Sequence, residues 1–352
     1  MMDGADDVYL MEHPDSTEDI PVLDIAPYIA GEPGARERLS KELGRISETV
    51  GFFQLIGHGL PQSLIDRMFG EARRLHLSPL EKRRTIKNIG RGTYRGIEDR
   101  PNISLNQKPR LNSSFNVHRE YPPDHPMNDM STVFRYPNAW PDWLPGFKEN
   151  VLEYYDRGEA LGRLLLPLWA AALDMPVDYF DKYFVDPHIT TTLLHYPPQK
   201  VMGNRQYGIP PHTDNNFITI LAQEDVPGLA VEMPSGHWRI VEPRRGAFVI
   251  NSGNTMVRIS NGRFKSTRHR VINIGEHDRF SVPIFFAPDL EAIVECAPTC
   301  VTAENPARYP PIRYEDLFYW HQYSEGARGF EQKAVGPDVK SEGLWVPAQD
   351  AK

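Results

Sequence analysis

The residues of this chain that best suit metal chemistry are two histidines and one aspartate. His212 and Asp214 lie two positions apart, and 54 residues separate Asp214 from His269. A histidine-x-aspartate pair with a second, distant histidine is the ligand set of the 2-His-1-carboxylate facial triad. Such a triad holds Fe(II) by one face and leaves the opposite positions open for substrate and O₂. The pattern therefore predicts a non-haem iron site with oxygenase chemistry.

A second copy of the histidine-x-aspartate pattern shows why context matters. It occupies residues 13–15, where a proline separates the two polar residues in an acidic stretch with few apolar side chains. His212 and Asp214 instead precede residues 217–221, a β-branched and aromatic run that predicts a buried strand. If the extended conformation reaches back to residue 212, both side chains lie on one face of that strand. A surface histidine beside a turn-capping aspartate is the alternative that this pair alone leaves open.

Another constellation follows the distal histidine. His269 opens a predicted strand over 270–274, and Arg279 and Ser281 lie two apart in the apolar run 279–286. The period of a strand places Arg279 and Ser281 on one face. An arginine fork with a hydroxyl beside it suits a carboxylate, and a buried arginine in so apolar a strand needs an anionic partner. We therefore expect a carboxylate-binding site on this strand.

Further motifs are spread along most of the chain in a fixed order. They are IPVLDI (20–25), GFFQLIGHGL (51–60), YPP (196–198), the segment 223–231, GAFVIN (246–251) and SNGRFKSTRHRV (260–271). Together with the histidine-x-aspartate…histidine and arginine-x-serine patterns, they resemble the isopenicillin N synthase-like family of non-haem Fe(II), 2-oxoglutarate-dependent dioxygenases. Two positions depart from that family's pattern, because Leu194 replaces a common asparagine and Asn254 replaces a common aspartate.

The resemblance implies a fold, a set of cofactors and an activity. The implied fold is α+β, a double-stranded β-helix (a distorted, cupin-like jelly roll) with a helical layer from the N-terminal half. The implied cofactors are Fe(II), 2-oxoglutarate as cosubstrate and O₂. The implied metal ligands are His212, Asp214 and His269, and the implied cosubstrate contacts are Arg279, Ser281 and Tyr196. The implied activity is oxidation of a small molecule in microbial specialised metabolism, by hydroxylation, desaturation, cyclisation or demethylation.

Three other interpretations stay open on the sequence. The first is a 2-oxoglutarate-independent iron oxidase of the isopenicillin N synthase type, since such oxidases also carry the arginine-x-serine pair. The second is a non-catalytic, metal-bound sensor or binding module on the same fold. The third is a likeness of fold alone, with a metal such as zinc. Oxygen consumption with Fe(II), measured with and without 2-oxoglutarate, separates them.

Composition narrows the class of protein and its partners. The chain has 352 residues, 40% of them hydrophobic, enough for a large core in one domain or two. A net charge of −8 argues against nucleic acid as a partner. Cys296 and Cys300 are too few for a disulfide framework and are expected to be ordinary thiols. Without an apolar run of spanning length or a charged-then-apolar leader, we expect a cytoplasmic protein that does not enter membranes; its oligomeric state is left open.

The order of predicted elements divides the chain into four regions. These are a loose N-terminal arm (1–19), a helical region with a lid (20–185), the jelly-roll core (186–296) and a C-terminal helix and tail (297–352). Strands are expected near 21–25 and 52–56, and helices over 34–44, after Pro61, over 147–173 and after Pro311. The segment 88–145 is rich in proline, asparagine, arginine and glycine with little periodicity, so we expect an irregular substrate lid.

Candidate substrate contacts come from the lid, the barrel strands and the last helix. They are Tyr94, Arg110, Asn112, Phe115, His118, Phe217, Ile284 or Phe286, and Tyr319 or Trp320. Three other histidines have no partner at metal spacing and are interpreted as structural, namely His58, His195 and His237.

Overall fold

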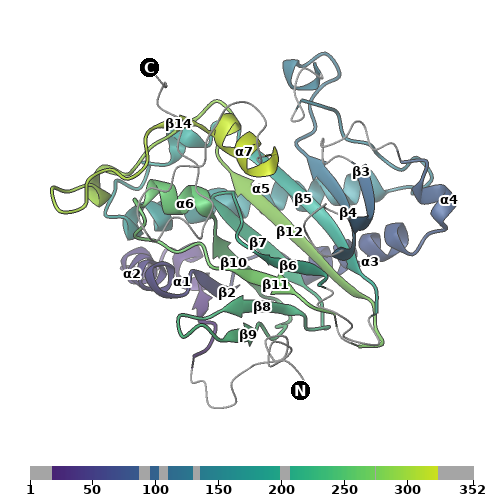
Figure 1. Cartoon of the computed structure of the whole chain (residues 1–352), viewed down its shortest axis with the longest axis horizontal. Helices are drawn as coiled ribbons and strands as arrows, with labels where there is room; N and C mark the ends of the chain where they lie inside the picture. Colours follow the sequence, from purple (N-terminus) through teal and green to yellow (C-terminus); the bar gives the residue numbers. More distant parts are fainter. Residues whose placement is uncertain are drawn as a thin grey trace, which may run out of the picture.

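The computed structural model describes residues 18–86, 96–102, 110–129, 135–198, 207–273 and 275–323. Two β-sheets occupy its centre (Figure 1). The larger one, called here the major sheet, has the strand order β1-β2-β10-β7-β12-β5-β4-β3 and is antiparallel except between β1 and β2. Its strands are β1 (Val22–Asp24), β2 (Phe52–Ile56), β3 (Gly96–Asn102), β4 (Arg110–His118), β5 (His188–Tyr196), β7 (Ile218–Gln223), β10 (Phe248–Ser252) and β12 (Arg279–Ala287).

The smaller sheet, called here the minor sheet, has the order β6-β11-β8-β9. Its strands are β6 (Ile209–His212), β8 (Leu229–Glu232), β9 (Trp238–Ile240) and β11 (His269–Val271), and a separate pair joins β13 (Ile293–Val294) to β14 (Ile312–Arg313). The chain alternates between the two sheets from β5 to β12. This alternation is the double-stranded β-helix that the resemblance implied, with the helical layer alongside it.

The helices differ in length, and the three longest cover one face of the major sheet, called here the outer face. The helices are α1 (Ala26–Ile29), α2 (Ala35–Thr49), α3 (Gln62–His76), α4 (Leu80–Arg83), α5 (Phe147–Ala172), α6 (Asn254–Ile259) and α7 (Tyr314–Tyr323), with 3₁₀ turns at Pro126–Asn128, Asp181–Tyr183 and Pro298–Cys300. Helix α5 packs directly on β12. Gly158 of this helix lies so close to β12 that an added Cβ would be 2.1 Å from Ile284 Cδ1. The Tyr154 hydroxyl also donates to the Val282 carbonyl at 3.1 Å.

The period of β12 sorts its side chains between two environments. Phe280, Val282 and Ile284 point to the outer face, where they are buried against the helical layer. Arg279 and Ser281 point to the opposite face, called here the inner face, which looks toward the minor sheet. Arg279 and Ser281 are nonetheless buried, each 1% exposed. A polar inner face beside an apolar outer face is what a barrel with an internal site requires.

The N-terminal half is more than a helical layer. It supplies four strands, β1 to β4, and these extend the major sheet at both edges. The expected irregular lid over 88–145 is wrong in part, because β3 and β4 pair in antiparallel fashion inside it. The strand over 52–56 is confirmed, as is the long helix within a residue at each end. The four-region division stays a prediction, although β4 and β5 lie side by side across its second boundary.

Two expectations about single features can also be compared with the structure. Cys296 and Cys300 are both free thiols, as expected. Among the described residues, we find no helix with both the length and the apolar character needed to cross a membrane.

Candidate active site

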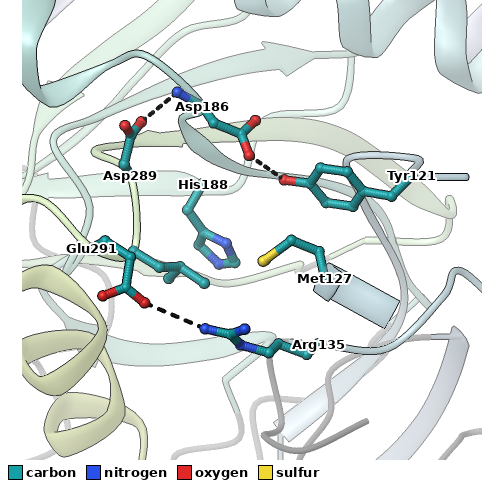
Figure 2. A pocket seen from close by; sticks show the side chains of 8 residues that line it. Tyr121, Met127, Arg135, Asp186, His188, Asp289 and Glu291 are labelled. Carbon is teal, nitrogen blue, oxygen red and sulfur yellow. Dashed lines mark hydrogen bonds and ion pairs between the residues drawn. The ribbon is translucent and has the colours of Figure 1, made fainter. Parts of the chain in front are cut away.

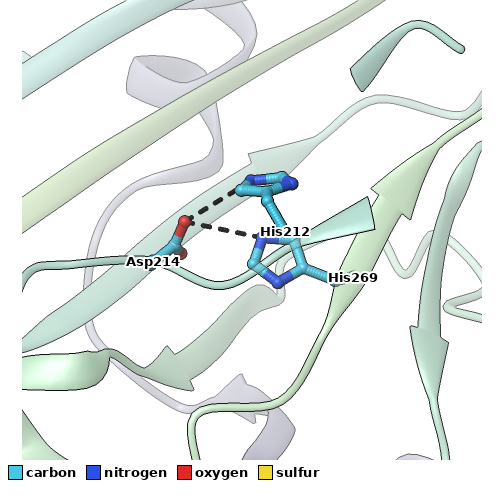
Figure 3. Close-up of side chains that lie close together, drawn as sticks. All are labelled: His212, Asp214 and His269. Atoms are coloured by element: carbon cyan, nitrogen blue, oxygen red, sulfur yellow. Dashed lines mark ion pairs between the residues drawn. The ribbon is translucent and has the colours of Figure 1, made fainter. Parts of the chain in front are cut away.

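The three predicted metal ligands come together where the two sheets meet. His212 ends β6, and its register partner across the minor sheet is His269, the first residue of β11. Asp214 lies in the loop that follows β6. Its Oδ1 atom is 3.6 Å from His212 Nε2 and 3.5 Å from His269 Nε2 (Figure 3). Within the ranges that the structure describes, these side chains form the one cluster of at least three histidine, cysteine or acidic residues whose ligand atoms could reach a single ion.

The local backbone differs from the expectation of one continuous strand. His212 belongs to the minor sheet, whereas the apolar run after it forms β7 of the major sheet, so the strand does not reach back to residue 212. Asp214 sits in the crossing between the sheets. Gly253 holds this crossing, because its N–H donates to the Phe217 carbonyl at 3.0 Å. A Cβ at Gly253 would lie 2.1 Å from the Asn216 carbonyl oxygen, so any larger residue would displace the loop.

Backbone carbonyls orient both imidazoles. His212 Nδ1 is 2.8 Å from the Pro210 carbonyl, and His269 Nδ1 is 3.1 Å from the Thr267 carbonyl. A carbonyl oxygen only accepts hydrogen bonds, so in each ring Nδ1 carries the hydrogen. In a neutral ring this leaves the lone pair on Nε2, the atom that faces Asp214. Such contacts orient metal-binding histidines and make them more basic.

The aspartate is held through its other oxygen. Oδ2 of Asp214 accepts hydrogen bonds from the Thr219 hydroxyl at 2.5 Å and from Asn251 Nδ2 at 2.8 Å. Burial opposes ionisation of this carboxyl, but His269, His212 and Thr219 outweigh it and hold its pKa well below the usual range. Oδ1 is thereby left for a metal. Neither Thr219 nor Asn251 was predicted from the sequence, although Asn251 is the last residue of the GAFVIN motif.

Asn254, the departure from the family pattern, also supports this loop. Its Nδ2 atom donates to Thr213 Oγ1 at 3.1 Å and to Asn215 Oδ1 at 2.8 Å, on either side of Asp214. Its N–H donates to the Asp214 carbonyl at 2.7 Å. The family's common residue at position 254 is charged, whereas Asn254 fixes the loop that carries Asp214 through neutral hydrogen bonds.

A buried guanidinium forms a second polar feature on the inner face. Arg279 pairs in register with Tyr196 of β5, and its guanidinium lies 4.9 Å from the centre of the Tyr196 ring. Nε donates to the Val226 carbonyl at 3.2 Å, and Nη2 donates to Gln223 Oε1 at 3.1 Å. Nη1 is buried without a hydrogen-bond partner among the described residues. Burial lowers the pKa of Arg279, and no carboxylate of the described residues lies within 4 Å of it.

Three of the expected substrate contacts lie in the core instead. Phe115 points to the outer face and meets Trp140 and Phe147, with ring centres 6.2 and 5.4 Å away. Phe217 and Phe286 both pack against Phe184 of the segment after α5, at 5.1 and 4.8 Å. All three are 0% exposed. The expectation that they touch substrate is therefore corrected, since they lie between the sheet and the helical layer, and the sheet separates them from the inner face.

The other expected contacts are distributed differently. Tyr94 lies outside the described residues, Arg110 begins β4, and Tyr319 lies on α7. The inner face of β4 carries polar side chains that pair with β5. Thr192 donates to Asn116 Oδ1 at 2.8 Å, and His118 Nδ1 is 3.1 Å from Thr190 Oγ1. Asn116 was not among the expected residues, and its position two residues from His118 would have shown that the two share a face.

The histidines interpreted as structural have protein partners. His58 Nε2 is 3.1 Å from the Gly246 carbonyl. His195 points to the outer face, where Nε2 is 2.6 Å from Asp278 Oδ1 and the ring stacks on Phe280. His237 Nδ1 is 3.1 Å from Ser235 Oγ. These contacts agree with the structural interpretation.

Comparison with sequence families matches most of the chain in two segments. Residues 20–143 match the family described as the N-terminal region of non-haem dioxygenase in morphine synthesis. Residues 187–288 match the 2OG-Fe(II) oxygenase superfamily, and this second segment contains the three predicted metal ligands, His212, Asp214 and His269.

Relatives and solved structures agree with these matches. The chain is 34% identical over 305 residues to the 2-oxoglutarate-Fe(II) type oxidoreductase hxnY of Emericella nidulans, covering 84% of this chain and 87% of the relative. It is 34% identical to the 2-oxoglutarate-dependent dioxygenase citB of Monascus ruber, over 77% of this chain and 85% of that protein. The crystal structure of a full-length Neurospora crassa protein in complex with alpha-KG superposes with a TM-score of 0.77 at 25% identity, covering 89% of this chain and 99% of that one.

These likenesses extend over the fold and the segment that carries the metal cluster. Fe(II), 2-oxoglutarate and O₂ are accordingly the cofactors of this protein, and its substrate is a small molecule. The chain belongs to the 2OG-Fe(II) oxygenase superfamily and is a 2-oxoglutarate-dependent Fe(II) dioxygenase.

Proposed function

We propose that His212, Asp214 and His269 bind the iron of this dioxygenase. The observation that carries the assignment is the orientation of the side chains, since both Nε2 atoms and Asp214 Oδ1 converge while the opposite atoms are held by the protein. Two imidazole nitrogens and one carboxylate oxygen suit Fe(II) and leave coordination positions for other ligands. The residues present therefore fit the metal that the family uses.

The cosubstrate site follows from the uncompensated charge of Arg279. A fully buried cation is costly unless an anion pairs with it. Nη1 of Arg279 is the donor that has no protein acceptor among the described residues, and we assign it to the C5 carboxylate of 2-oxoglutarate. Ser281 on the same face and the Tyr196 phenol beside the guanidinium are further donors for that carboxylate.

The chain's own residues position the reactants rather than supply the oxidising power. When bound, iron with 2-oxoglutarate and O₂ supplies the oxidant for an otherwise unreactive C–H bond. Arg279 would hold the distal carboxylate of the cosubstrate, and the triad would hold the metal at its other end. The burial of Arg279 and Ser281, each 1% exposed, keeps water from the carboxylate that they hold.

We place the substrate entry at the end of the barrel where His118 of β4, His188 of β5 and Phe318 of α7 lie together. Parts of the segment 88–145 border this end, so its role as a lid stays part of the proposal. We also keep a cytoplasmic location and the absence of a nucleic-acid partner as predictions, which rest on the net charge of −8 and the two free thiols.

The proposal is tested by anaerobic calorimetry followed by turnover. Fe(II) should bind first, and 2-oxoglutarate should then bind to the iron-loaded protein. On admission of O₂, succinate should form only when both are present. Oxygen consumption that is indifferent to 2-oxoglutarate would instead favour the 2-oxoglutarate-independent oxidase, and iron binding without any oxygen consumption would favour the sensor.

A further inference from the structure

A cavity of about 150 Å³ lies apart from the metal and cosubstrate residues. Its walls include Tyr121, Met127, Arg135, His188, Asp289 and Leu290 (Figure 2). Tyr121, Met127 and Arg135 come from the segment expected to form the lid. His188 begins β5, and Asp289 and Leu290 follow the end of β12. A cavity of this volume in another protein holds benzene, so a single ring is the size of group that fits.

The sheet register places this cavity on the substrate side of the barrel. His188 shares the inner face with Thr190, which pairs through Phe285 with Thr219, the residue that donates to Asp214. Thr219 lies two strands away from Thr190, and His188 lies two residues along β5 from Thr190. From these spacings, the Cα atoms of His188 and Thr219 are roughly 12 Å apart. Arg279 and Tyr196 lie at the opposite end of the same two strands. A small molecule could therefore reach from the cavity to the metal without displacing the cosubstrate.

The cavity is lined by more negative than positive charge. Asp186, Asp289 and Glu291 contribute three carboxylates, against one guanidinium from Arg135. Two of the carboxylates already have cations beside them. Asp186 Oδ1 is 2.9 Å from Arg119 Nε, and Glu291 contacts both Arg135, at 3.3 Å, and Arg313, at 3.2 Å.

Asp289 is the carboxylate whose charge stays uncompensated. Its Oδ1 accepts from the Asp186 N–H at 2.8 Å, but no lysine, arginine or histidine of the described residues lies within 4 Å of it. Burial raises its pKa to about 6, helped by the charge of Asp186 and opposed by the backbone donors of residues 185 and 186 and by Arg163 on α5. Figure 2 shows the side chain on the cavity wall above His188. A half-buried anion of this kind gains most from a cationic ligand.

We propose that this cavity binds a part of the substrate that carries both a ring and a protonated amine. Asp289 is the counter-ion of that amine. The proposal rests on the proposed function, because it assigns the cavity to the substrate of that site. Met127 and Leu290 supply apolar contact for the ring. The Tyr121 hydroxyl donates to Asp186 at 2.8 Å and so holds the residue whose N–H donates to Asp289. The substrate class is thus a small organic amine.

The test uses equilibrium dialysis of the anaerobic protein loaded with Fe(II) and 2-oxoglutarate at pH 7.5. The probes are benzylammonium, benzyl alcohol and benzoate, which share a ring and differ in charge. Benzylammonium should bind at least tenfold more tightly than benzyl alcohol, and benzoate should bind most weakly. Equal affinities for the cation and the alcohol would overturn the proposal.

Two variants and one matched control locate the probe. Asp289→Asn should reduce benzylammonium affinity at least tenfold and leave benzyl alcohol unchanged, whereas Met127→Trp, which fills the cavity, should weaken both. Glu295→Gln removes a carboxylate that pairs with Lys182 outside the cavity and should change affinity less than twofold. Unchanged cation binding in Asp289→Asn or Met127→Trp sinks the proposal. Iron and 2-oxoglutarate binding are measured on the same samples, so loss of those alone contradicts the proposed function instead.

Discussion

The predicted metal site and the carboxylate site both carry charge and lie between the two sheets, yet they differ in how that charge is balanced. Asp214 has two imidazoles on one oxygen and two hydrogen-bond donors on the other. Arg279 has neutral acceptors for two of its nitrogens and none for Nη1 among the described residues. In the first site the protein already holds the atoms that orient the three ligand side chains. In the second site the described residues supply no counter-charge for the guanidinium.

This difference indicates how each site uses its ligand. The metal cluster is preorganised, so its geometry does not wait for iron. The carboxylate site stores the cost of burying a cation, and binding an anion relieves that cost. Loss of a residue should therefore damage the first site through missing ligands and the second through missing charge. Separate measurements of Fe(II) binding and of 2-oxoglutarate binding distinguish loss of a metal ligand from loss of the counter-charge.

The largest effect is expected from removal of a metal ligand. His212→Ala, Asp214→Ala or His269→Ala should abolish turnover and sharply weaken Fe(II) binding, because a facial triad has no spare ligand. Bound iron is measured by metal analysis and turnover by oxygen consumption, with circular dichroism to check the fold. His237→Ala, at a histidine outside the cluster whose ring contacts Ser235, serves as the control and should behave as wild type. Wild-type turnover in any one triad variant contradicts the assignment.

Removal of the counter-charge should act on the cosubstrate and not on iron. Arg279→Leu should weaken 2-oxoglutarate binding by on the order of a hundredfold, about 3 kcal/mol, with Fe(II) affinity nearly unchanged. Arg279→Lys should recover only part of the loss, since an ammonium lacks the fork, and Ser281→Ala should cost about 1 to 2 kcal/mol. Calorimetry gives both affinities. Arg268→Leu, at an exposed arginine paired with Glu232, is the matched control, and an equal loss there would remove the special role of Arg279.

A smaller effect is expected where the protein supports the metal ligands. Asn251→Ala removes one of the two donors to Asp214 Oδ2 and should weaken Fe(II) binding by about tenfold to a hundredfold. The 2-oxoglutarate affinity of the iron-saturated variant should change far less. If both affinities fall together, the two sites are coupled, and the contrast between them does not hold.

The smallest effect concerns Asp289, a half-buried charge that resembles Arg279 in having no counter-ion among the residues that the structure describes. Its folded pKa of about 6 lies above the ordinary value of 3.8, so the folded state holds the proton more tightly. The resulting stability is present below pH 4 and is lost as pH rises through 6. Asp289→Asn should thus raise the melting temperature at pH 8, by roughly 1–2 °C after allowing for solvent screening, and by less at pH 4.5. A benefit that is equal at both pH values would mean that the charge is not the cause.

The residues proposed to bind the metal and the cosubstrate could be predicted from the sequence, because their types and their order along the chain indicate what they bind. Two histidines, an aspartate and an arginine-x-serine pair keep their meaning wherever the chain brings them together. The orientation of β12 also followed from the sequence, since a period of two places Arg279 and Ser281 on one face. The jelly roll itself came from the family resemblance, because short alternating runs do not determine strand order.

The missed features depend on contacts between segments far apart in the chain. Phe115 was expected to touch substrate because residues 88–145 showed no clear period, and its face became defined only once β4 was known to pair with β5. The crossing after His212 depends on the close approach of Gly253 to Asn216, 37 positions away. Phe217 and Phe286 depend on where α5 packs. No local pattern records any of these contacts.

The crossing between the sheets has a thermodynamic consequence. His212 and His269 belong to the minor sheet, whereas the side chains that hold Asp214 come from β7 and β10 of the major sheet. An ion bound by all three would tie the two layers together as a removable cross-link. Because such an ion binds the folded chain in preference to the unfolded one, it adds stability that grows with the logarithm of its free concentration. At a hundred times the dissociation constant this amounts to about 2.7 kcal/mol, so resistance to heat would report how much of the protein carries its metal.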